Sequence, residues 1–232
     1  MYNPLSGSGE FVEFTNIGNT PIDMTGWSYD DDSRTPGSVS LSGFGIVAPG
    51  QSVILTEVAP ATFIANWGLS GVTVVGPHSN NLGRNDEINL YDAGGLLVDR
   101  LTYGDQNFPG TIRTAGISGW TCLQNLGENN VYGWQLSLVG DQQGSYNAAS
   151  GDRGNPGVYV GVPCSLCSTC LGDADRNGSV ALADIAAFVD CALGNSLIDD
   201  CRCADMNEDG EIDGRDMQAF ADVVVGSPGN CP

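Results

Sequence analysis

Short runs of alternating apolar and polar residues recur along the first two thirds of the chain, with turn residues between them. Residues 10–15 read Glu-Phe-Val-Glu-Phe-Thr, which is the alternation of a half-buried strand. Residues 61–67 are the one segment of this region with the pattern of a short helix. We expect further strands, with a hairpin turn at 92–95, over residues 26–29, 46–55, 72–75, 87–91 and 96–103. Strands spaced about ten residues apart and joined by Gly and Pro turns predict a β-sandwich.

The pattern changes near residue 158. We expect a sandwich over residues 1–157, a Cys-rich linker over 158–170 and a small separate unit over 171–232. The last unit contains one pattern twice, because residues 173–194 and 205–226 align in register. Each copy is a loop rich in Asp, Asn and Gly, followed by a short helix that contains Ala-Phe-x-Asp.

Oxygen-bearing side chains stand at the same positions of both loops. Each loop has Gly at position 6 and a β-branched residue at position 8. Ca²⁺ takes about six to eight oxygen ligands, and the chain must turn sharply at position 6 to surround the ion. The pattern therefore predicts two bound Ca²⁺ ions, with the position-7 carbonyl as a further ligand in each loop. The donors at positions 1, 3, 5 and 12 are Asp173, Asp175, Asn177 and Asp184 in the first loop, and Asp205, Asn207, Asp209 and Asp216 in the second.

A duplicated loop-helix unit with Asp at position 12, and with no helix before either loop, resembles a type I dockerin over residues 172–226. In cellulosomal dockerins, hydroxyl residues at positions 10 and 11 recognise the receptor. Here those positions are 182–183 (Leu-Ala) and 214–215 (Gly-Arg), so we do not expect the standard receptor. The resemblance implies calcium ligation by Asp173, Asp175, Asn177, Ser179 and Asp184, and by Asp205, Asn207, Asp209, Glu211 and Asp216, with Asp213 acting through water.

Calcium is expected to make this unit fold. Clustered carboxylates repel one another without metal, and two short helices bury little apolar surface. We expect Val180 and Ile212 to pair as a short β-bridge behind the ions. The expected core residues are Ile185, Phe188, Val189, Met217, Phe220 and Val224.

The composition narrows the choice of partners. The formal net charge is −20, with 28 acidic residues against 8 basic ones, all of which are Arg. Such a surface repels phosphate backbones and anionic lipid, so nucleic acid is not expected as a partner. No run of apolar residues is long enough for membrane insertion.

The chain has eight cysteines, seven of them at or after residue 164. This density favours disulfides, and with them an extracellular or cell-surface location, over a zinc site in the Cys164-x-x-Cys167-x-x-Cys170 segment. The sequence leaves the pairing open. The pairings considered are Cys191 with Cys201 or Cys203, Cys231 with a residue near Cys170, and Cys122 with Cys164 or Cys167.

The first 110 residues resemble a lamin-tail domain, which has an immunoglobulin-like sandwich fold. The resemblance is carried by residues 9–27 and 85–99, by Tyr103-Gly104 and by the closing residues 154–157. In that family an apolar strand precedes a Tyr-Asn-Pro-like turn, whereas here Tyr2-Asn3-Pro4 comes almost at once. We therefore expect that Met1 is not the natural start, and that the first strand is absent or is supplied by another chain. The overall expectation is a mainly β protein, with an immunoglobulin-like sandwich followed by a small α module of two F-hand calcium motifs.

Other chemistry finds little support in the sequence. His78 is the only histidine and is expected in a solvated loop, and Glu10 and Glu13 are expected on the solvent face of their strand. Residues 30–32, three Asp in a row, fit an exposed acidic turn better than a cation site. We find no convincing catalytic arrangement, so an enzyme is not expected.

Three functions remain. The first is a non-catalytic extracellular structural or assembly protein stabilised by calcium, such as a subunit of a surface appendage or filament built by strand exchange between chains. The second is a docking module for a protein receptor. The third is a carbohydrate-binding accessory part of a secreted hydrolase, with polysaccharide stacked on Trp27, Trp67, Trp120 or Trp134.

Overall fold

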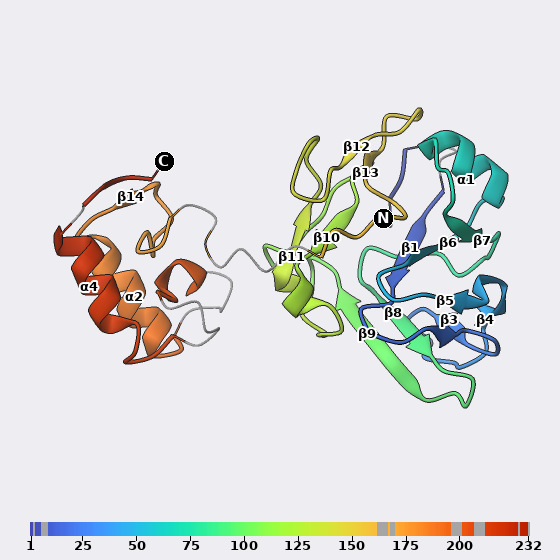
Figure 1. Ribbon diagram of the computed structural model, residues 1–232, viewed down its shortest axis with the longest axis horizontal. Coiled ribbons are helices and arrows are strands. Elements are labelled where there is room, and N and C mark those ends of the chain that lie inside the picture. Colours follow the sequence, from blue (N-terminus) through green and yellow to red (C-terminus); the bar gives the residue numbers. More distant parts are fainter. Residues whose placement is uncertain are drawn as a thin grey trace. The chain divides into compact units, whose positions relative to one another are not determined.

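The chain folds into two compact units, Met1–Pro163 and Cys164–Pro232 (Figure 1). The computed structural model describes residues 1, 3–5, 9–161, 167, 170–195, 201–206, 212–226 and 228–231. The first unit is mainly β, and the second contains short helices. No helix among these residues has the length and apolar character needed to cross a membrane.

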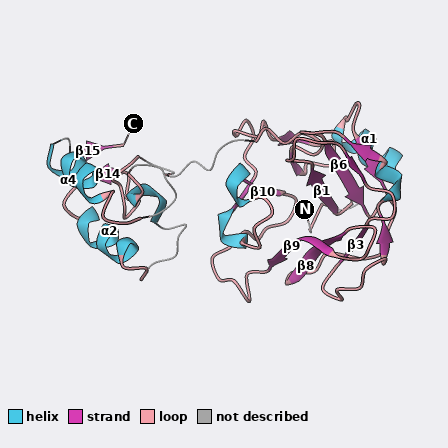
Figure 2. Cartoon of the chain, turned by 60° about the horizontal axis from the view of Figure 1, so that its bottom comes forward, coloured by secondary structure: helices cyan, strands magenta, loops and turns pink. Residues whose placement is uncertain are grey.

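Two sheets face each other in the first unit, as the strand pattern predicts. One has the order β1 (Phe11–Thr15), β6 (Ser52–Thr56), β7 (Thr73–Val75), and the other has the order β4 (Val39–Ser40), β3 (Ser28–Asp30), β8 (Asp86–Tyr91), β9 (Leu97–Tyr103). Figure 2 shows them as two layers. A separate antiparallel pair is formed by β2 (Ile22–Asp23) and β5 (Ile46–Val47).

The strand β6 is buried on both faces, because a helix covers the sheet on the outside. Val53 and Leu55 pack between the two sheets, while Ile54 packs with Phe63 and Trp67 of helix α1 (Pro60–Trp67). This helix connects β6 to the parallel strand β7, a connection that antiparallel neighbours do not need. It begins at Pro60, as the fixed φ of proline favours, and ends at Gly68 in the left-handed conformation (φ 65°).

Residues 105–161 form turns and short pairs rather than long strands. β10 (Gly119–Thr121) pairs with β11 (Trp134–Leu136), and β12 (Tyr146–Asn147) pairs with β13 (Arg153–Gly154). The 3₁₀ helices of the unit are η1 (Ser42–Phe44), η2 (Leu123–Asn125) and η3 (Val131–Gly133).

The expectation that Glu10 and Glu13 line a solvent face is wrong. The Glu10 carboxylate is half-buried and accepts a hydrogen bond from the Leu82 N–H (2.6 Å), and burial raises its pKa to about 7. The Glu13 carboxylate accepts one from the Gly157 N–H (3.1 Å), and burial raises its pKa as well. Both faces of β1 are therefore covered, one of them by the segment that closes the unit.

The second unit is a small α module. Its described residues form β14 (Ser179–Val180), α2 (Asp184–Ala192), η4 (Arg202–Ala204), α4 (Met217–Gly226) and β15 (Gly229–Asn230). The rings of Phe188 and Phe220 stack at its centre, with centroids 4.1 Å apart. Of the expected core, Phe188, Phe220 and Val224 are buried, whereas Ile185, Val189 and Met217 are exposed. Two helices of this length cover only one row of side chains on each other, so the adjacent rows face solvent.

Three disulfides join described cysteines: Cys167–Cys203, Cys170–Cys231 and Cys191–Cys201. The zinc interpretation is therefore wrong, because Cys167 and Cys170 are each bonded to another cysteine. Cys122 is also disulfide-bonded, and its expected partner Cys167 is excluded. The other expected partner, Cys164, lies outside the described residues. Disulfides in this number point to an oxidising environment.

Candidate metal centre

The first loop brings the carboxylates of Asp173, Asp175 and Asp184 together. One ligand oxygen from each lies within 4.8 Å of the others. Asp173 starts the loop and Asp184 is the first residue of α2, so the turn between them folds the chain back on itself. That turn requires Gly178 at position 6, which adopts a φ of 86°.

Backbone N–H groups hold these carboxylates in place. Asp173 accepts hydrogen bonds from the N–H groups of Asn177 (3.0 Å) and Gly178 (2.9 Å). Asp184 accepts them from Asp175 (3.0 Å, at Oδ1) and Ala181 (2.8 Å, at Oδ2). Each accepting oxygen keeps a second lone pair, so a cation can bind beside the N–H donors.

The clustered carboxylates of the first loop carry negative charge that a bound cation would compensate. Asp173 and Asp184 are fully buried, and Asp175 lies beside them. Converging carboxylates in a buried position are unstable unless a positive charge or a proton compensates them. The donor set consists of carboxylate and amide oxygens, which is what Ca²⁺ prefers. The residues present therefore fit a calcium ion.

The pairing of β14 with β15 determines the direction of the Ser179 carbonyl. Ser179 pairs with Asn230 in the β14–β15 ladder, and the Cys231 N–H donates to the Gly178 carbonyl at 2.8 Å. Peptide groups alternate in direction along an antiparallel strand, so the Ser179 carbonyl points away from β15. Its side chain instead bonds toward the strand, with Oγ 3.3 Å from the Gly229 carbonyl. The carbonyl at position 7 therefore takes no part in the β14–β15 ladder.

The described part of the second loop follows the first. Asp205 and Asp216 are buried. Asp216 accepts hydrogen bonds from the N–H groups of Met206 (2.9 Å) and Asp213 (2.9 Å), much as Asp184 does in the first loop. Asn207, Asp209 and Glu211 lie outside the described residues, so the ligand set of this loop stays a prediction.

The structure also bears on two further expectations for the module, the Val180–Ile212 bridge and the role of Asp213. Val180 pairs with Gly229 and not with Ile212, so the expected bridge between the two loops is wrong. The Asp213 carboxylate is exposed and forms an ion pair with Arg215 (2.9 Å), which lowers its pKa. A role for Asp213 through water would have to compete with this ion pair.

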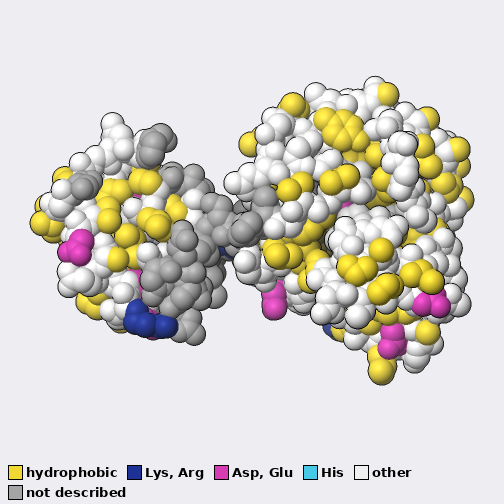
Figure 3. All heavy atoms as spheres, in the orientation of Figure 1, with side chains coloured by type: hydrophobic (Ala, Val, Ile, Leu, Met, Phe, Trp, Pro, Cys, Tyr) yellow, Lys and Arg dark blue, Asp and Glu magenta, His cyan; other side chains and the backbone are white. Residues whose placement is uncertain are grey.

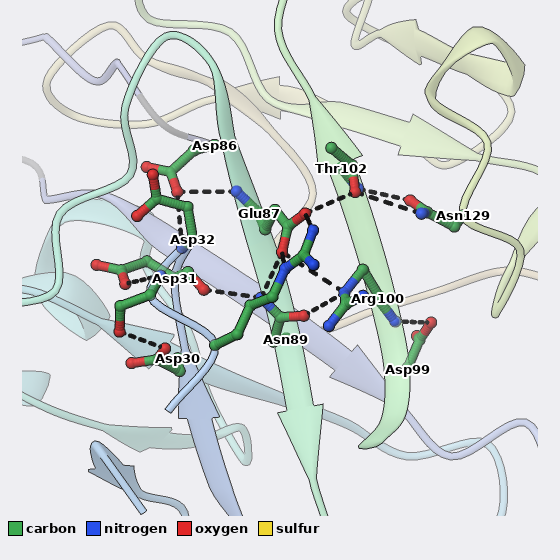
Figure 4. Close-up of polar contacts among 12 residues, drawn as sticks. Asp30, Asp31, Asp32, Asp86, Glu87, Asn89, Asp99, Arg100, Thr102 and Asn129 are labelled. Carbon is green, nitrogen blue, oxygen red and sulfur yellow. Dashed lines mark hydrogen bonds and ion pairs between the residues drawn. The ribbon is translucent and has the colours of Figure 1, made fainter. Parts of the chain in front are cut away.

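A polar network on the sandwich explains the acidic run at residues 30–32 (Figure 4). Asp30 is fully buried and accepts hydrogen bonds from Ser33 Oγ (2.7 Å), the Thr35 N–H (2.6 Å) and Asn80 Nδ2 (3.2 Å). Asp32 donates its N–H to Asp86 at 3.2 Å. The run is therefore not a fully exposed turn, since Asp30 fixes the loop that follows it.

The same network contains a charged centre that the sequence does not reveal. The Glu87 carboxylate, 6% exposed, accepts two hydrogen bonds from Arg34 (2.6 and 2.8 Å) and one from Thr102 Oγ1 (3.1 Å). The Arg34 guanidinium lowers the pKa of Glu87 to about 2. These residues are far apart in the sequence, and only the pairing of β3, β8 and β9 brings them together.

The remaining candidates, His78 and the four tryptophans, are all at least partly buried. His78 lies in a loop as expected, but it is half-buried with its ring edge-on to Tyr29, and burial lowers its pKa. Trp67 is buried in the core, and the other three tryptophans, Trp27, Trp120 and Trp134, are partly buried. No row of exposed indole rings exists for sugar stacking.

Residues 1–105 match the family model of the Lamin Tail Domain. The match covers the strands from β1 to β9, in agreement with the resemblance seen in the sequence. The Lamin Tail Domain is an immunoglobulin-like structural fold, and the match is consistent with the mainly β architecture of this unit. The match does not reach the C-terminal unit. No curated protein matches the chain.

Proposed function

We propose that this protein is a non-catalytic, extracellular building block whose C-terminal module folds around two calcium ions. The observation that carries the proposal is the first loop, where Asp173, Asp175 and Asp184 converge and two of them are fully buried. The dockerin-like loop pattern and the three disulfides agree with it. Calcium and cystine formation are both favoured outside the cell.

The experiment is a calcium titration of the purified chain by calorimetry, combined with circular dichroism. We expect two bound ions per chain, and a loss of helical signal when a chelator removes them. An Asp173→Asn/Asp184→Asn variant tests the assignment, and Asp190→Asn/Asp222→Asn, two exposed helix carboxylates, is the matched control. A chain that binds no calcium, or two-ion binding by the loop variant, would show the proposal to be wrong.

Assembly through the edge of β1 is the second part of the proposal. Met1 already pairs with Phe11, with its amine donating to the Phe11 carbonyl (2.7 Å) and its carbonyl accepting from the Phe11 N–H (3.0 Å). By strand alternation the peptide groups of Glu13 and Thr15 point to the same side. Among the described residues none forms a backbone hydrogen bond with them there.

A groove of about 470 Å³ runs beside this edge and leads into the sandwich. Its apolar lining includes Phe14, Trp27, Leu90 and Leu101. An open strand edge above an apolar groove is the arrangement that accepts an added strand. We propose that another chain supplies this strand, and that repetition of the contact builds a filament.

Light scattering and electron microscopy in calcium test the assembly. We expect concentration-dependent association of the wild-type chain. Thr15→Pro removes the outward N–H and should weaken the association, while Thr15→Ser keeps the N–H and should not. A wild-type chain that stays monomeric at every concentration would contradict the strand-exchange proposal but leave the calcium proposal intact.

Docking to a protein receptor is the second candidate function. Ile185 and Val189 lie four residues apart on one side of α2, and Leu182 and Leu193 flank its two ends; these four side chains are 44–71% exposed. Hydrophobic side chains are visible at the surface of this unit in Figure 3. Exposed apolar rows of this kind favour a protein partner.

The docking candidate predicts that Ile185→Lys/Val189→Lys abolishes co-purification of a partner from the native medium while calcium binding is retained. Val225→Lys on α4 is the control, because this side chain is also highly exposed. An unchanged set of co-purifying proteins would count against docking through α2.

A further inference from the structure

The last residues of the module lie directly against the first calcium loop. The ladder of β14 and β15 joins Ser179 to Asn230 and Val180 to Gly229. The Cys231 N–H extends the ladder by donating to the Gly178 carbonyl at 2.8 Å. The C-terminal segment is therefore bonded to loop positions 6, 7 and 8, which are the positions that turn the chain round the ion.

A disulfide ties this segment to the start of the same loop. Cys231 is bonded to Cys170, and the Cys170 carbonyl accepts a hydrogen bond from the N–H of Asp173 at 3.0 Å. Cys231 Sγ also lies 3.5 Å from Asp173 Oδ2. The disulfide thus connects Cys170, which is hydrogen-bonded to Asp173 at position 1, to β15, which is hydrogen-bonded to positions 6 to 8. We call residues 229–231 together with Cys170 the clasp.

The second loop shows no equivalent contact among its described residues. Its position-8 residue, Ile212, belongs to no strand. The two loops therefore share a sequence pattern and the backbone hydrogen bonds to their position-12 aspartate, while the contact with β15 is seen for the first loop.

We propose that the clasp is a positioning element for the first calcium site, and that the Cys170–Cys231 bridge raises the calcium affinity of that site alone. This rests on the proposed calcium function. Ligands held in place before binding lose less conformational freedom when the ion arrives, so the affinity rises without any new ligand. The clasp holds the Ser179 carbonyl and the Asp173 carboxylate, which stand on opposite sides of the turn at Gly178.

The test compares calcium titrations of isotopically labelled full-length variants, followed by the amide NMR signals of Gly178 and Gly210, the position-6 residues of the two loops. Cys170→Ser/Cys231→Ser should weaken the first site at least tenfold, with the second site changed less than twofold. Cys191→Ser/Cys201→Ser is the matched control, because that bridge joins the end of α2 to the start of η4, and it should leave the first site within twofold of wild type.

A second variant separates positioning from folding. Gly229→Pro keeps all cysteines but removes a backbone donor from the β14–β15 ladder, and no neighbouring atom lies near the position of an added Cβ. It should also weaken the first site selectively. If Cys170→Ser/Cys231→Ser and Gly229→Pro both bind calcium at the first site within twofold of wild type, the inference is wrong while the proposed calcium function stands. If the wild-type chain binds no calcium, the proposed function itself fails.

Discussion

Asp184→Asn is the most informative single substitution in the first loop. Asp184 is fully buried, and each of its two carboxylate oxygens accepts a backbone N–H, from Asp175 and from Ala181. An asparagine has one acceptor oxygen, so one of these donors would face an NH₂ group. A buried donor left without a partner costs about 1–3 kcal/mol. This part of the effect is present with or without calcium.

The second part of the effect appears only in calcium. An ion present at one hundred times its dissociation constant stabilises the folded state by about 2.7 kcal/mol, and at its dissociation constant by only about 0.4 kcal/mol. A hundredfold weaker site in the variant would therefore forfeit roughly 2 kcal/mol of calcium-dependent stability. For a unit of this size, that corresponds to a fall in Tm of about 8–16 °C.

Thermal unfolding followed by far-UV circular dichroism, with and without calcium, separates the two parts. We expect a lower Tm for Asp184→Asn in both conditions and a smaller rise on calcium addition. Asp190→Asn carries the same charge change on the exposed face of α2 and should behave like wild type. If Asp184→Asn keeps the full calcium-dependent rise, then Asp184 is not a ligand and the assignment of position 12 is wrong.

Three other predictions follow from the contacts described above. Chelation should unfold the C-terminal module but leave the sandwich intact, so calorimetry should show two transitions, with only one shifting on calcium removal; a shift of both would contradict this. Phe188→Ala should destabilise the module by about 3–5 kcal/mol, whereas Val189→Ala, one residue on and exposed, should change it by less than about 0.5 kcal/mol in denaturant titrations. Glu87→Gln should destabilise the sandwich by about 1–2 kcal/mol, since Arg34 is partly exposed and its ion pair is screened. Because the pKa of Glu87 falls from its usual 4.5 to about 2 on folding, wild type should lose this stability as the pH falls from about 4.5 toward 2, and the variant should lack that part of the acid dependence.

Most strands of the sandwich can be predicted from local sequence patterns. Alternation at β1 and at the β8–β9 hairpin is visible in the sequence, because each side chain there meets either the core or the outside according to its place in the strand. The same rule fails for Glu13, whose outward face is covered by Gly157 from far along the chain. It also gives no sign of the Glu87–Arg34 centre, which depends on which strands become neighbours.

The two proposed calcium loops are recognisable in the sequence because all the predicted ligands of each loop lie within twelve consecutive residues. The clasp is recognisable only in part: the pairing of Cys231 with a cysteine near Cys170 is among those expected, but Gly229 and Asn230 have no strand pattern that predicts the ladder with the loop. Helical spacing likewise groups Ile185 and Val189 with apolar neighbours, but it cannot tell which row a second helix will cover. In a module with two short helices, the rows of side chains left exposed are as long as the buried row, so the sequence does not distinguish them.

The Cys170–Cys231 bridge has a mechanical consequence. It connects a residue at the entrance of the module to one at its exit, across a sequence separation of 61 residues. Tension applied through the two ends of the module would pass along this covalent link, and the loops and helices between them would carry almost none of it. A unit under pull or shear would therefore keep the proposed calcium sites intact, because the load path does not run through the carboxylates of the loops.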